Sequence, residues 1–377
     1  MRALTVERAS TLRGHTVLLR ASLNVPVENG VVRNPFRLDA ALKTVTLLSS
    51  AGARVVLISH IDGDGSPSLR PVYEYLKTKV PLVFVEDVAG ERARAAVHAL
   101  TDGHVALIEN VRRDAGEVVN DDAFARRLAS LGDVYVNDDF AAAHRKHASI
   151  IGVPQYLPSY AGLQFVAEVE GLTKALEPKS PSLAIVGGAK FVTKEPLIRA
   201  LLPKYDFVFV GGALAIDFYK AKGYEVGKSL VSDSPHLADL LTNSKVILPV
   251  DATVVGPAGT FVKDVRELLP NDTIYDIGPK SIETLKPLAA KARTVLWNGP
   301  LGNFEKGFSS MTEELAKVLA DAPGVSVVGG GDTIAAIQKL GLNDKFEFVS
   351  TAGGAMLDFL AHGTLPGIEA LKNAKTL

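Results

Sequence analysis

The chain has 377 residues, of which 47% are hydrophobic and 22% charged, and this length predicts two domains rather than one ordinary core. It contains no cysteine, which excludes disulfides, thiolate metal sites and cysteine nucleophiles. Its net charge is −1 and neither sign forms a long run, so we expect no nucleic-acid or membrane-surface partner. Because no stretch reaches the roughly 18 apolar residues of a membrane span, we expect a cytoplasmic protein.

Short runs of β-branched and aliphatic residues recur along the whole chain and predict buried strands. They lie at 17–20, 54–59, 82–86, 105–109, 134–137, 183–186, 207–210, 246–250, 294–297 and 325–328. Segments with helical spacing lie between them, for example at 38–51, 122–131, 194–202 and 311–319. This alternation predicts an α/β fold made of parallel sheets covered by helices.

The strand spacing is disturbed at 154–158, and an amphipathic stretch follows at 166–176. Because that stretch ends in the Pro-rich run Glu177-Pro178-Lys179-Ser180-Pro181, we place the domain boundary there. We therefore expect two Rossmann-like domains, at 1–158 and 182–355, joined by a connecting helix and hinge at 159–181.

The two halves of the chain end their predicted strands differently. Strands of the first half end in the polar residues Arg20, Ser59-His60, Glu109-Asn110 and Asn137-Asp138, and strands of the second half end in Gly187-Gly188, Gly211-Gly212, Asn298-Gly299 and Gly329-Gly330-Gly331. Ligands of open parallel sheets bind at the carboxyl ends of the strands. The first domain thus presents polar side chains to a ligand, and the second lets a ligand approach its backbone closely. This difference indicates two different ligands.

A glycine pair between a strand and a helix lets backbone N–H groups approach a phosphate. Lys190 follows such a pair, and Lys194 lies four residues beyond it, so both amines could reach one phosphate chain. The alternative is tight strand-to-helix packing with two solvated lysines. Asp332 follows the glycines at 329–331 and is either a Mg²⁺ contact or an ordinary N-cap. Gly353-Gly354 is a further turn of this kind, whereas the P-loop and G-x-G-x-x-G motifs are absent.

The first half carries cationic and polar side chains at or beyond its strand ends. These are Asn24, Arg37, His60, Arg112, His144 and Arg145. Guanidinium groups pair bidentately with phosphate and carboxylate, so the set predicts an anion pocket. Surface arginines, a structural histidine and a solvated turn at 143–149 are the alternatives for its individual members.

Eleven segments taken in order resemble the motif series of the phosphoglycerate kinase family, from about residue 17 to 370. They are RASLNVPVENGVV, SHIDGDG, IENVR, YVNDDFAAAHRKHAS, AIVGGAKFVTK, VGGALAIDFYKAKG, LPVD, DIGP, WNGPLGNFE, GGGDT and STAGGAMLDFLAHGTLPG. The resemblance implies reversible phosphoryl transfer between ATP and 3-phosphoglycerate, in glycolysis. It implies a first domain for the acid, a second for ATP or ADP with Mg²⁺, hinge closure, and a C-terminal segment at 356–377 that returns to the first domain.

The resemblance also implies roles for individual residues. We expect a monomer, because no feature of the sequence requires an oligomer. The catalytic residues would be Arg37, Lys194 and Gly354. The acid-binding residues would be Ser22, Leu23, Asn24, Arg37, His60, Gly63, Arg112 and Arg145. The nucleotide-binding residues would be Lys190, Lys194, Gly211, Gly212, Asn298, Pro300, Glu305 at the ribose, Gly330, Gly331, Asp332 and Thr333, with Asp332 also at the metal.

The chain departs from the family pattern mainly in the predicted acid pocket. Ser22 stands where the family has aspartate, and Gly63, preceded by Asp62, stands where it has arginine; Asp139, Ala141 and Ala352 are smaller changes. Loss of a phosphate-pairing arginine removes about 1.5–3 kcal/mol, which is about a tenfold to hundredfold loss of affinity. The alternatives are a kinase with weakened acid affinity, a kinase for another carboxylate, and a weakly active ATP-binding protein with an interaction role.

Overall fold

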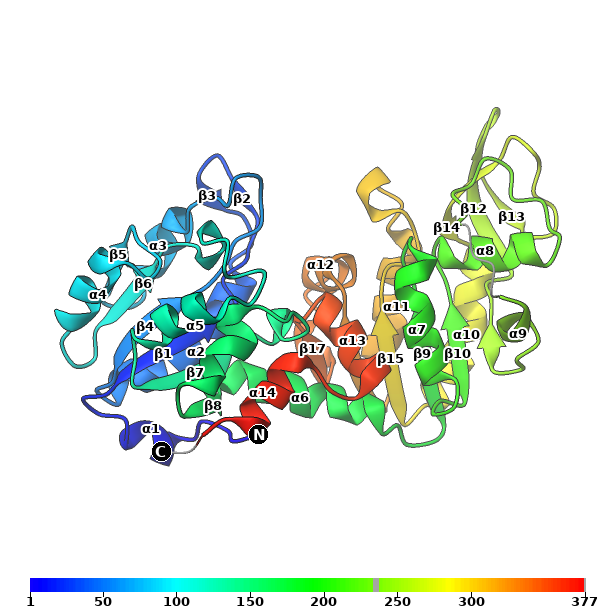
Figure 1. The fold of residues 1–377 in the computed structure, drawn as a ribbon. Coiled ribbons are helices and arrows are strands. Elements are labelled where there is room, and N and C mark those ends of the chain that lie inside the picture. Colours follow the sequence, from blue (N-terminus) through cyan, green and yellow to red (C-terminus); the bar gives the residue numbers. More distant parts are fainter. Residues whose placement is uncertain (233–236, 376–377) are drawn as a thin grey trace. The chain divides into compact units, whose positions relative to one another are not determined.

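A computed structural model describes residues 1–232 and 237–375 of the chain (Figure 1). The chain divides into two compact units. The first unit comprises residues 1–169 and the C-terminal residues from 364 onward, and the second comprises 170–363. The division falls within helix α6 (Leu163–Leu176). It leaves α13 (Gly354–His362) in the second unit, because this helix packs against α7 (Phe191–Leu201).

A six-stranded parallel sheet in the order β5-β6-β4-β1-β7-β8 forms the centre of the first unit. Its strands are β1 (Thr16–Ala21), β4 (Arg54–Ile58), β5 (Leu82–Val85), β6 (Val105–Ile108), β7 (Val134–Asp138) and β8 (Ser159–Ala161). The five strands predicted in this half are confirmed; β8 was missed because three residues are too short for a pattern. Arg20 pairs in register with Ile58 on one side and Asn137 on the other, so the carboxyl ends of these strands are level.

Helices of the first unit bury their apolar residues against this sheet. Leu38 and Val45 of α2 belong to the same buried cluster as Leu19 and Val55 of the strands. The helices are α1 (Val6–Ser10), α2 (Phe36–Ser50), α3 (Arg70–Leu76), α4 (Glu91–His98), α5 (Asp122–Ala129) and α14 (Pro366–Asn373), and a small hairpin joins β2 (Val27–Glu28) to β3 (Val31–Val32). The residues from 366 to 373 thus lie on the first unit.

The second unit contains another parallel sheet, in the order β11-β10-β9-β15-β16-β17. Its strands are β9 (Ser182–Val186), β10 (Phe207–Val210), β11 (Val246–Ile247), β15 (Thr294–Asn298), β16 (Val325–Gly329) and β17 (Phe348–Ser350). Four of the five strands predicted here are confirmed, the fifth is limited to the two residues of β11, and β17 was not predicted; the α/β class with parallel sheets is correct. Val210, Val186, Asn298 and Gly329 are successive register partners, so four strands end at one level.

The second unit also holds an antiparallel sheet that the sequence did not predict. It consists of β12 (Asp251–Gly256), β13 (Gly259–Asp264) and β14 (Thr273–Ile277), with β12 in the centre. Phe261 and Val262 on β13 are exposed, so this segment lacks the buried run by which the other strands were recognised. The helices of the unit are α7, α8 (Leu214–Ala221), α9 (Ala238–Leu241), α10 (Pro279–Lys291), α11 (Ser310–Ala320), α12 (Gly331–Lys339) and α13.

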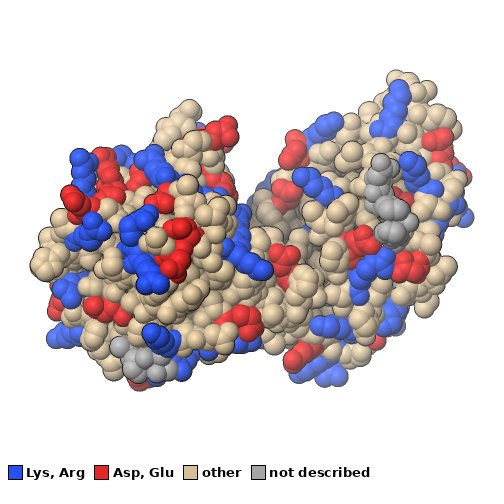
Figure 2. Space-filling model, in the orientation of Figure 1, with Lys and Arg blue, Asp and Glu red and all other residues tan. Residues whose placement is uncertain are grey.

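Charges of both signs are mixed on the visible face of each unit (Figure 2), in keeping with the net charge of −1. No single-sign field covers either unit in this view. Among the residues described, no helix combines the length and the apolar character needed to cross a membrane. Any anion site must therefore be a local arrangement of a few side chains and backbone groups.

Candidate active site

The glycine turns at the strand ends of the second unit pack directly against one another. A Cβ atom on Gly187 would lie 2.2 Å from the carbonyl oxygen of Pro300. Gly212 has φ +63°, and its Cβ would lie 2.8 Å from the backbone nitrogen of Gly188. Side chains cannot fit at these positions, so the packing interpretation of the glycines is correct for the turns themselves. The same packing holds three turns side by side, with backbone groups at the edge of the sheet.

Helices begin at this edge, and their first N–H groups have no partner within the helix. Gly330, with φ +108°, precedes α12, and Gly331 is its exposed first residue. The hydroxyl of Thr333 accepts a hydrogen bond of 3.1 Å from the backbone N–H of Gly299 and so ties α12 to the neighbouring turn. Gly354 begins α13 with open space where a Cβ would lie. Gly211 packs on Leu301, so its role at the edge is close packing.

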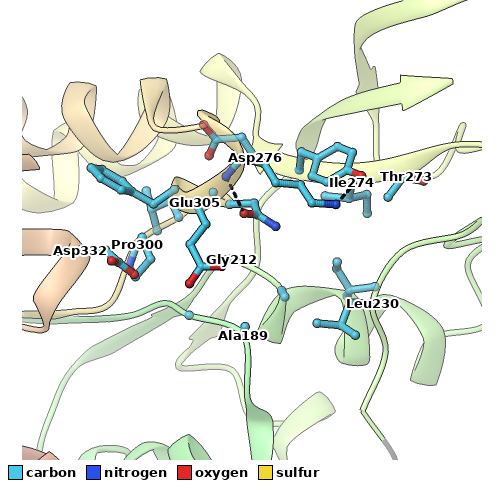
Figure 3. A pocket seen from close by; sticks show the side chains of 18 of the residues that line it. Ala189, Gly212, Leu230, Thr273, Ile274, Asp276, Pro300, Glu305 and Asp332 are labelled. Carbon is cyan, nitrogen blue, oxygen red and sulfur yellow. Dashed lines mark hydrogen bonds between the residues drawn. The ribbon is translucent and has the colours of Figure 1, made fainter. Parts of the chain in front are cut away.

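A cavity of about 490 Å³ opens beside these turns (Figure 3). Four of the predicted nucleotide residues line it: Gly212, Pro300, Glu305 and Asp332. Apolar side chains form part of its wall, including those of Ile216, Leu230, Ile274, Leu301 and Phe304. An apolar wall beside backbone turns and a few charged groups is typical of a pocket for a small organic ligand with phosphate groups.

Lys194 and Asn298 lie together near the same edge, and Lys190 is separate from them. The amine of Lys194 donates a hydrogen bond to the side-chain oxygen of Asn298. Burial lowers the pKa of Lys194 to about 8. Lys190 is exposed, immediately before α7. The two lysines therefore differ: Lys194 is a desolvated amine held at the end of β15, whereas Lys190 is solvated as the alternative interpretation expected.

Asp332 and Glu305 are two carboxylates that line the same cavity, and the charge of Glu305 acts on Asp332. Burial, and then the charge of Glu305, raise the pKa of Asp332. The Asp332 carboxylate accepts no hydrogen bond from the residues that the structure describes, so it does not act as a side-chain N-cap. Within the described part of the chain no three His, Cys, Asp or Glu residues form a metal-binding group. One or two carboxylates are nevertheless what Mg²⁺ uses when substrate phosphates complete its shell, so these residues fit that ion.

The cavity also contains polar residues that the sequence reasoning did not single out. Asp276, at the end of β14, accepts backbone hydrogen bonds from Met311 and Ile277, and burial raises its pKa to about 7. Lys306 lies over the ring of Tyr275, 5.0 Å from the centroid. Asp276 belongs to the DIGP motif at 276–279, which was the available signal. Lys306 and Tyr275 had none, because only folding brings Tyr275 of the antiparallel sheet beside Lys306 of the turn at 304–306.

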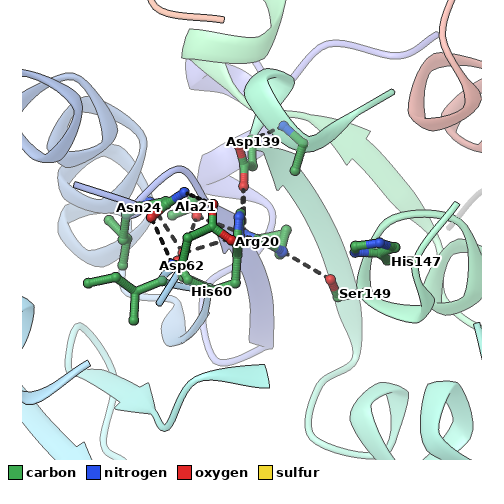
Figure 4. A network of polar contacts seen from close by, with 12 residues as sticks. Arg20, Ala21, Asn24, His60, Asp62, Asp139, His147 and Ser149 are labelled. Atoms are coloured by element: carbon green, nitrogen blue, oxygen red, sulfur yellow. Dashed lines mark hydrogen bonds and ion pairs between the residues drawn. The ribbon is translucent and has the colours of Figure 1, made fainter. Parts of the chain in front are cut away.

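A buried polar network lies at the strand ends of the first unit (Figure 4). Arg20 is only 1% exposed; it forms an ion pair of 2.6 Å with Asp139 and donates a bond of 3.0 Å to Ser149. Ser149 in turn donates to the buried carboxylate of Glu117. A buried guanidinium is stable only when it is paired and hydrogen-bonded, so Asp139 is a structural partner here.

His60 is the member of this network that the sequence singled out. Its Nδ1 atom lies 2.7 Å from Nη2 of Arg20. Arginine can only donate, so Nδ1 accepts and the ring proton is on Nε2. Burial and then the charges of Arg20 and Arg145 hold the pKa of His60 well below its usual range. His60 is therefore a neutral hydrogen-bond donor at neutral pH.

The predicted anion-binding side chains of the first unit have different partners in the structure. Arg37 donates a bond of 3.1 Å to the backbone oxygen of Asn24. Arg112 forms an ion pair with Asp62, and Asn24 donates a bond of 2.7 Å to the same carboxylate. Burial lowers the pKa of Arg145. Asp62, which the sequence marked only as the residue before Gly63, thus contacts two of the predicted acid-binding residues.

The three remaining predicted acid-binding positions are accounted for by local packing. Leu23 has a core side chain, and its backbone N–H donates to Ser59. Ser22 is buried and directly follows β1. Gly63 has φ +145°, and a Cβ there would lie 3.0 Å from Cγ of Pro67. An arginine at position 63 would therefore be strained in this loop, so the departure involves the backbone as well as the side chain.

One parallel-sheet unit ends in glycine turns beside a desolvated lysine, and the other carries arginines such as Arg112 beyond its strand ends. Groups of this kind suit a phosphotransferase. Transfer of a phosphoryl group depends on positioning and charge neutralisation, which such groups supply. The family model for phosphoglycerate kinase matches residues 7–363. The chain belongs to the phosphoglycerate kinase family.

Individual relatives agree with the family model over nearly the whole length. Phosphoglycerate kinases of Methylorubrum extorquens and Dictyoglomus turgidum are each 42% identical, over 98% and 97% of this chain respectively and 98% of their own. The phosphoglycerate kinase structure from Coxiella burnetii is 39% identical with a TM-score of 0.82, covering 97% of this chain and 98% of its own. That from Pyrococcus horikoshii is 32% identical with a TM-score of 0.86, covering 99% and 98%.

Proposed function

We propose that this chain catalyses reversible phosphoryl transfer between ATP and the carboxylate of 3-phosphoglycerate, as a glycolytic kinase. The observation that carries the proposal is the edge of the second sheet, where four strands end level and glycine turns border a cavity of about 490 Å³. The turns and helix N-termini suit phosphate groups, and the apolar wall suits a nucleoside. Family membership supports the same activity.

In the second unit, the nucleotide would bind against Gly211, Gly212, Pro300 and the segment from Gly330 to Thr333, with Glu305 at the ribose. Lys194 would contact the transferring phosphoryl group, supported by Asn298 and by Lys190. Asp332 would hold Mg²⁺, which neutralises phosphate charge when it is bound. Two observations support this division: Lys194 is desolvated at the end of β15, where its pKa is lowered to about 8, and Asp332 lines the cavity together with Glu305.

In the first unit, the acid would bind through Asn24, Arg37, His60, Arg112 and Arg145. Arg37 would stabilise the charge that develops on the phosphoryl group in the transition state. His60 would donate from Nε2 to a phosphate oxygen, which suits a neutral ring whose Nδ1 is already engaged. The backbone N–H of Gly354 would contact the phosphoryl group during transfer. The enzyme would be monomeric and cytoplasmic, with a hinge near α6.

Asp62 and Gly63 favour a second candidate, a kinase of this family for a carboxylate without a phosphate. The ion pair between Asp62 and Arg112 reduces the positive charge available to a phosphate. Both candidates transfer a phosphoryl group to a carboxylate, and they differ in the remainder of the acid. Assays with 3-phosphoglycerate and with phosphate-free carboxylates separate them.

The decisive test is a coupled assay of ATP formation from 1,3-bisphosphoglycerate and ADP. Arg37→Ala should lower kcat by about 10²- to 10³-fold, because it removes a group that stabilises transition-state charge. Arg33→Ala is the matched control: Arg33 lies four residues away, pairs on the surface with Glu28, and should retain wild-type turnover. Absence of turnover by folded wild-type protein would exclude the proposed activity.

A further inference from the structure

The carboxylate of Asp62 lies beside the side chain of Asn24 (Figure 4) and also contacts Arg112, a second side chain of the proposed acid pocket. One of its oxygens pairs with Nη1 of Arg112, and the other accepts a bond of 2.7 Å from the amide of Asn24. The backbone N–H of Asp62 donates back to the side-chain oxygen of Asn24, at 3.0 Å. These contacts engage Asn24 twice and supply the negative partner of Arg112.

The loop that carries Asp62 is held in place at both ends. The amide of Asn110 donates to the backbone oxygens of Ile61 and Pro67, which flank the loop, at 3.0 and 2.9 Å. The hydroxyl of Ser66 donates to the backbone oxygen of Arg112 at 3.1 Å. Inside the loop, Gly63 adopts φ +145°, a conformation that other residues rarely adopt. Asp62 is thus directed at Arg112 by the loop conformation.

Arg112 and Asp62 differ in their exposure to solvent. The side chain of Arg112 is 14% exposed and that of Asp62 51%. In the described residues, Nε and Nη2 of Arg112 are buried and have no hydrogen-bond partner. A buried donor without a partner is costly, so the guanidinium retains capacity for an anion with more oxygens than one carboxylate supplies. The half-exposed Asp62 is the partner that can leave.

We propose that Asp62 is a specificity-determining residue, an internal carboxylate that occupies Arg112 and Asn24 and that the incoming acid must displace. This proposal rests on the function proposed above, since it assigns these two residues to acid binding. Displacement discriminates between acids, because only a multiply charged group such as a phosphate replaces the ion pair and also satisfies the remaining donors of Arg112. The cost of displacement lowers the affinity for every acid that uses this subsite.

Asp62→Asn tests the proposal in the full-length protein, because it keeps the shape of the side chain and removes its charge. The KM for 3-phosphoglycerate, and its Kd from titration calorimetry, should fall about three- to tenfold; the half-exposed pair is partly screened, which limits the gain. The KM for ATP should stay the same. Asp64→Asn, in the same loop, makes the same charge change at an exposed position and should alter neither constant by more than about twofold.

Binding and turnover are measured separately, so that failure of the proposed kinase activity can be distinguished from failure of the proposed displacement of Asp62. Tighter binding by Asp62→Asn without turnover by any variant supports the displacement and excludes the kinase activity. Turnover with unchanged KM and Kd in Asp62→Asn overturns the displacement and leaves the activity intact. Equal effects of Asp62→Asn and Asp64→Asn would indicate a general charge effect and overturn the displacement. The displacement is also overturned if none of the proteins binds 3-phosphoglycerate. Equal thermal unfolding midpoints of the variants exclude misfolding as the cause.

Discussion

Lys194 donates a hydrogen bond from its amine to the side-chain oxygen of Asn298, the last residue of β15. The bond fixes the amine beside the glycine turns, and burial lowers its pKa from 10.5 to about 8. This amine can therefore lose its proton within the working range of pH.

The first prediction concerns the pH dependence of catalysis. A lowered pKa means that Lys194 loses its charge as the pH rises through about 8, so kcat/KM for ATP should decline above that pH. Lys194→Arg keeps its charge throughout and should lose this alkaline decline, although its rate falls because the guanidinium cannot occupy the same position. The same decline in both proteins would mean that another group titrates.

The second prediction concerns the glycine turns. Gly212→Ala should destabilise the protein by about 2–4 kcal/mol and raise the KM for ATP, because φ is +63° and the new Cβ would meet Gly188 and Pro300. Gly341→Ala is the matched control, with φ +67° and open space around the Cβ, and should cost only about 1 kcal/mol. Urea unfolding midpoints of the two variants measure the difference; equal midpoints would contradict the close packing.

The third prediction concerns the protonation of His60. Its depressed pKa means that the folded protein leaves the ring neutral at pH values where the unfolded chain binds a proton. Long-range ¹H–¹⁵N spectra should show the Nε2–H tautomer unchanged from pH 8 down to pH 6. The stability contributed by the neutral ring is present above about pH 6.5 and is lost as the pH falls below it. Titration of the ring near pH 6.5 in the folded protein would refute the assignment.

The fourth prediction concerns Asp276. Burial raises its pKa to about 7, so the folded protein retains a proton there that the unfolded chain has lost. The stabilising effect is complete below about pH 4 and disappears as the pH rises through 7. Between pH 5 and 8 the wild type should lose about 2 kcal/mol relative to Asp276→Asn, measured from urea unfolding at each pH. Parallel curves for the two proteins would show that Asp276 is already ionised at pH 5.

The fifth prediction concerns Mg²⁺. Asp332→Asn should raise the Mg²⁺ concentration needed for half-maximal activity at least about tenfold, because it removes a carboxylate that can bind the ion. Fluorescence titration of the protein–ADP complex with Mg²⁺ should show the same shift without turnover. Asp321→Asn, at the end of α11, removes a carboxylate outside the cavity and serves as the control. Equal Mg²⁺ requirements of the two variants would exclude Asp332 as a ligand.

The sequence by itself determined the α/β class, all strands of the two parallel sheets except β8 and β17, and the contrast between polar and glycine strand ends. These features are local, since a run such as 294–298 is buried on both faces wherever it lies in a parallel sheet. The motif order was likewise sufficient for the family, because eleven short patterns do not depend on how the chain folds.

Only the tertiary structure decided the surroundings of the candidate site residues. It separated the desolvated amine of Lys194 from exposed Lys190, although both follow the same turn, and it placed Asp276 of an unpredicted sheet in the wall of the cavity beside the glycine turns. It also showed Asp62 paired with Arg112, fifty residues away along the chain. Desolvation and pairing depend on neighbours distant in sequence, so no local pattern records them.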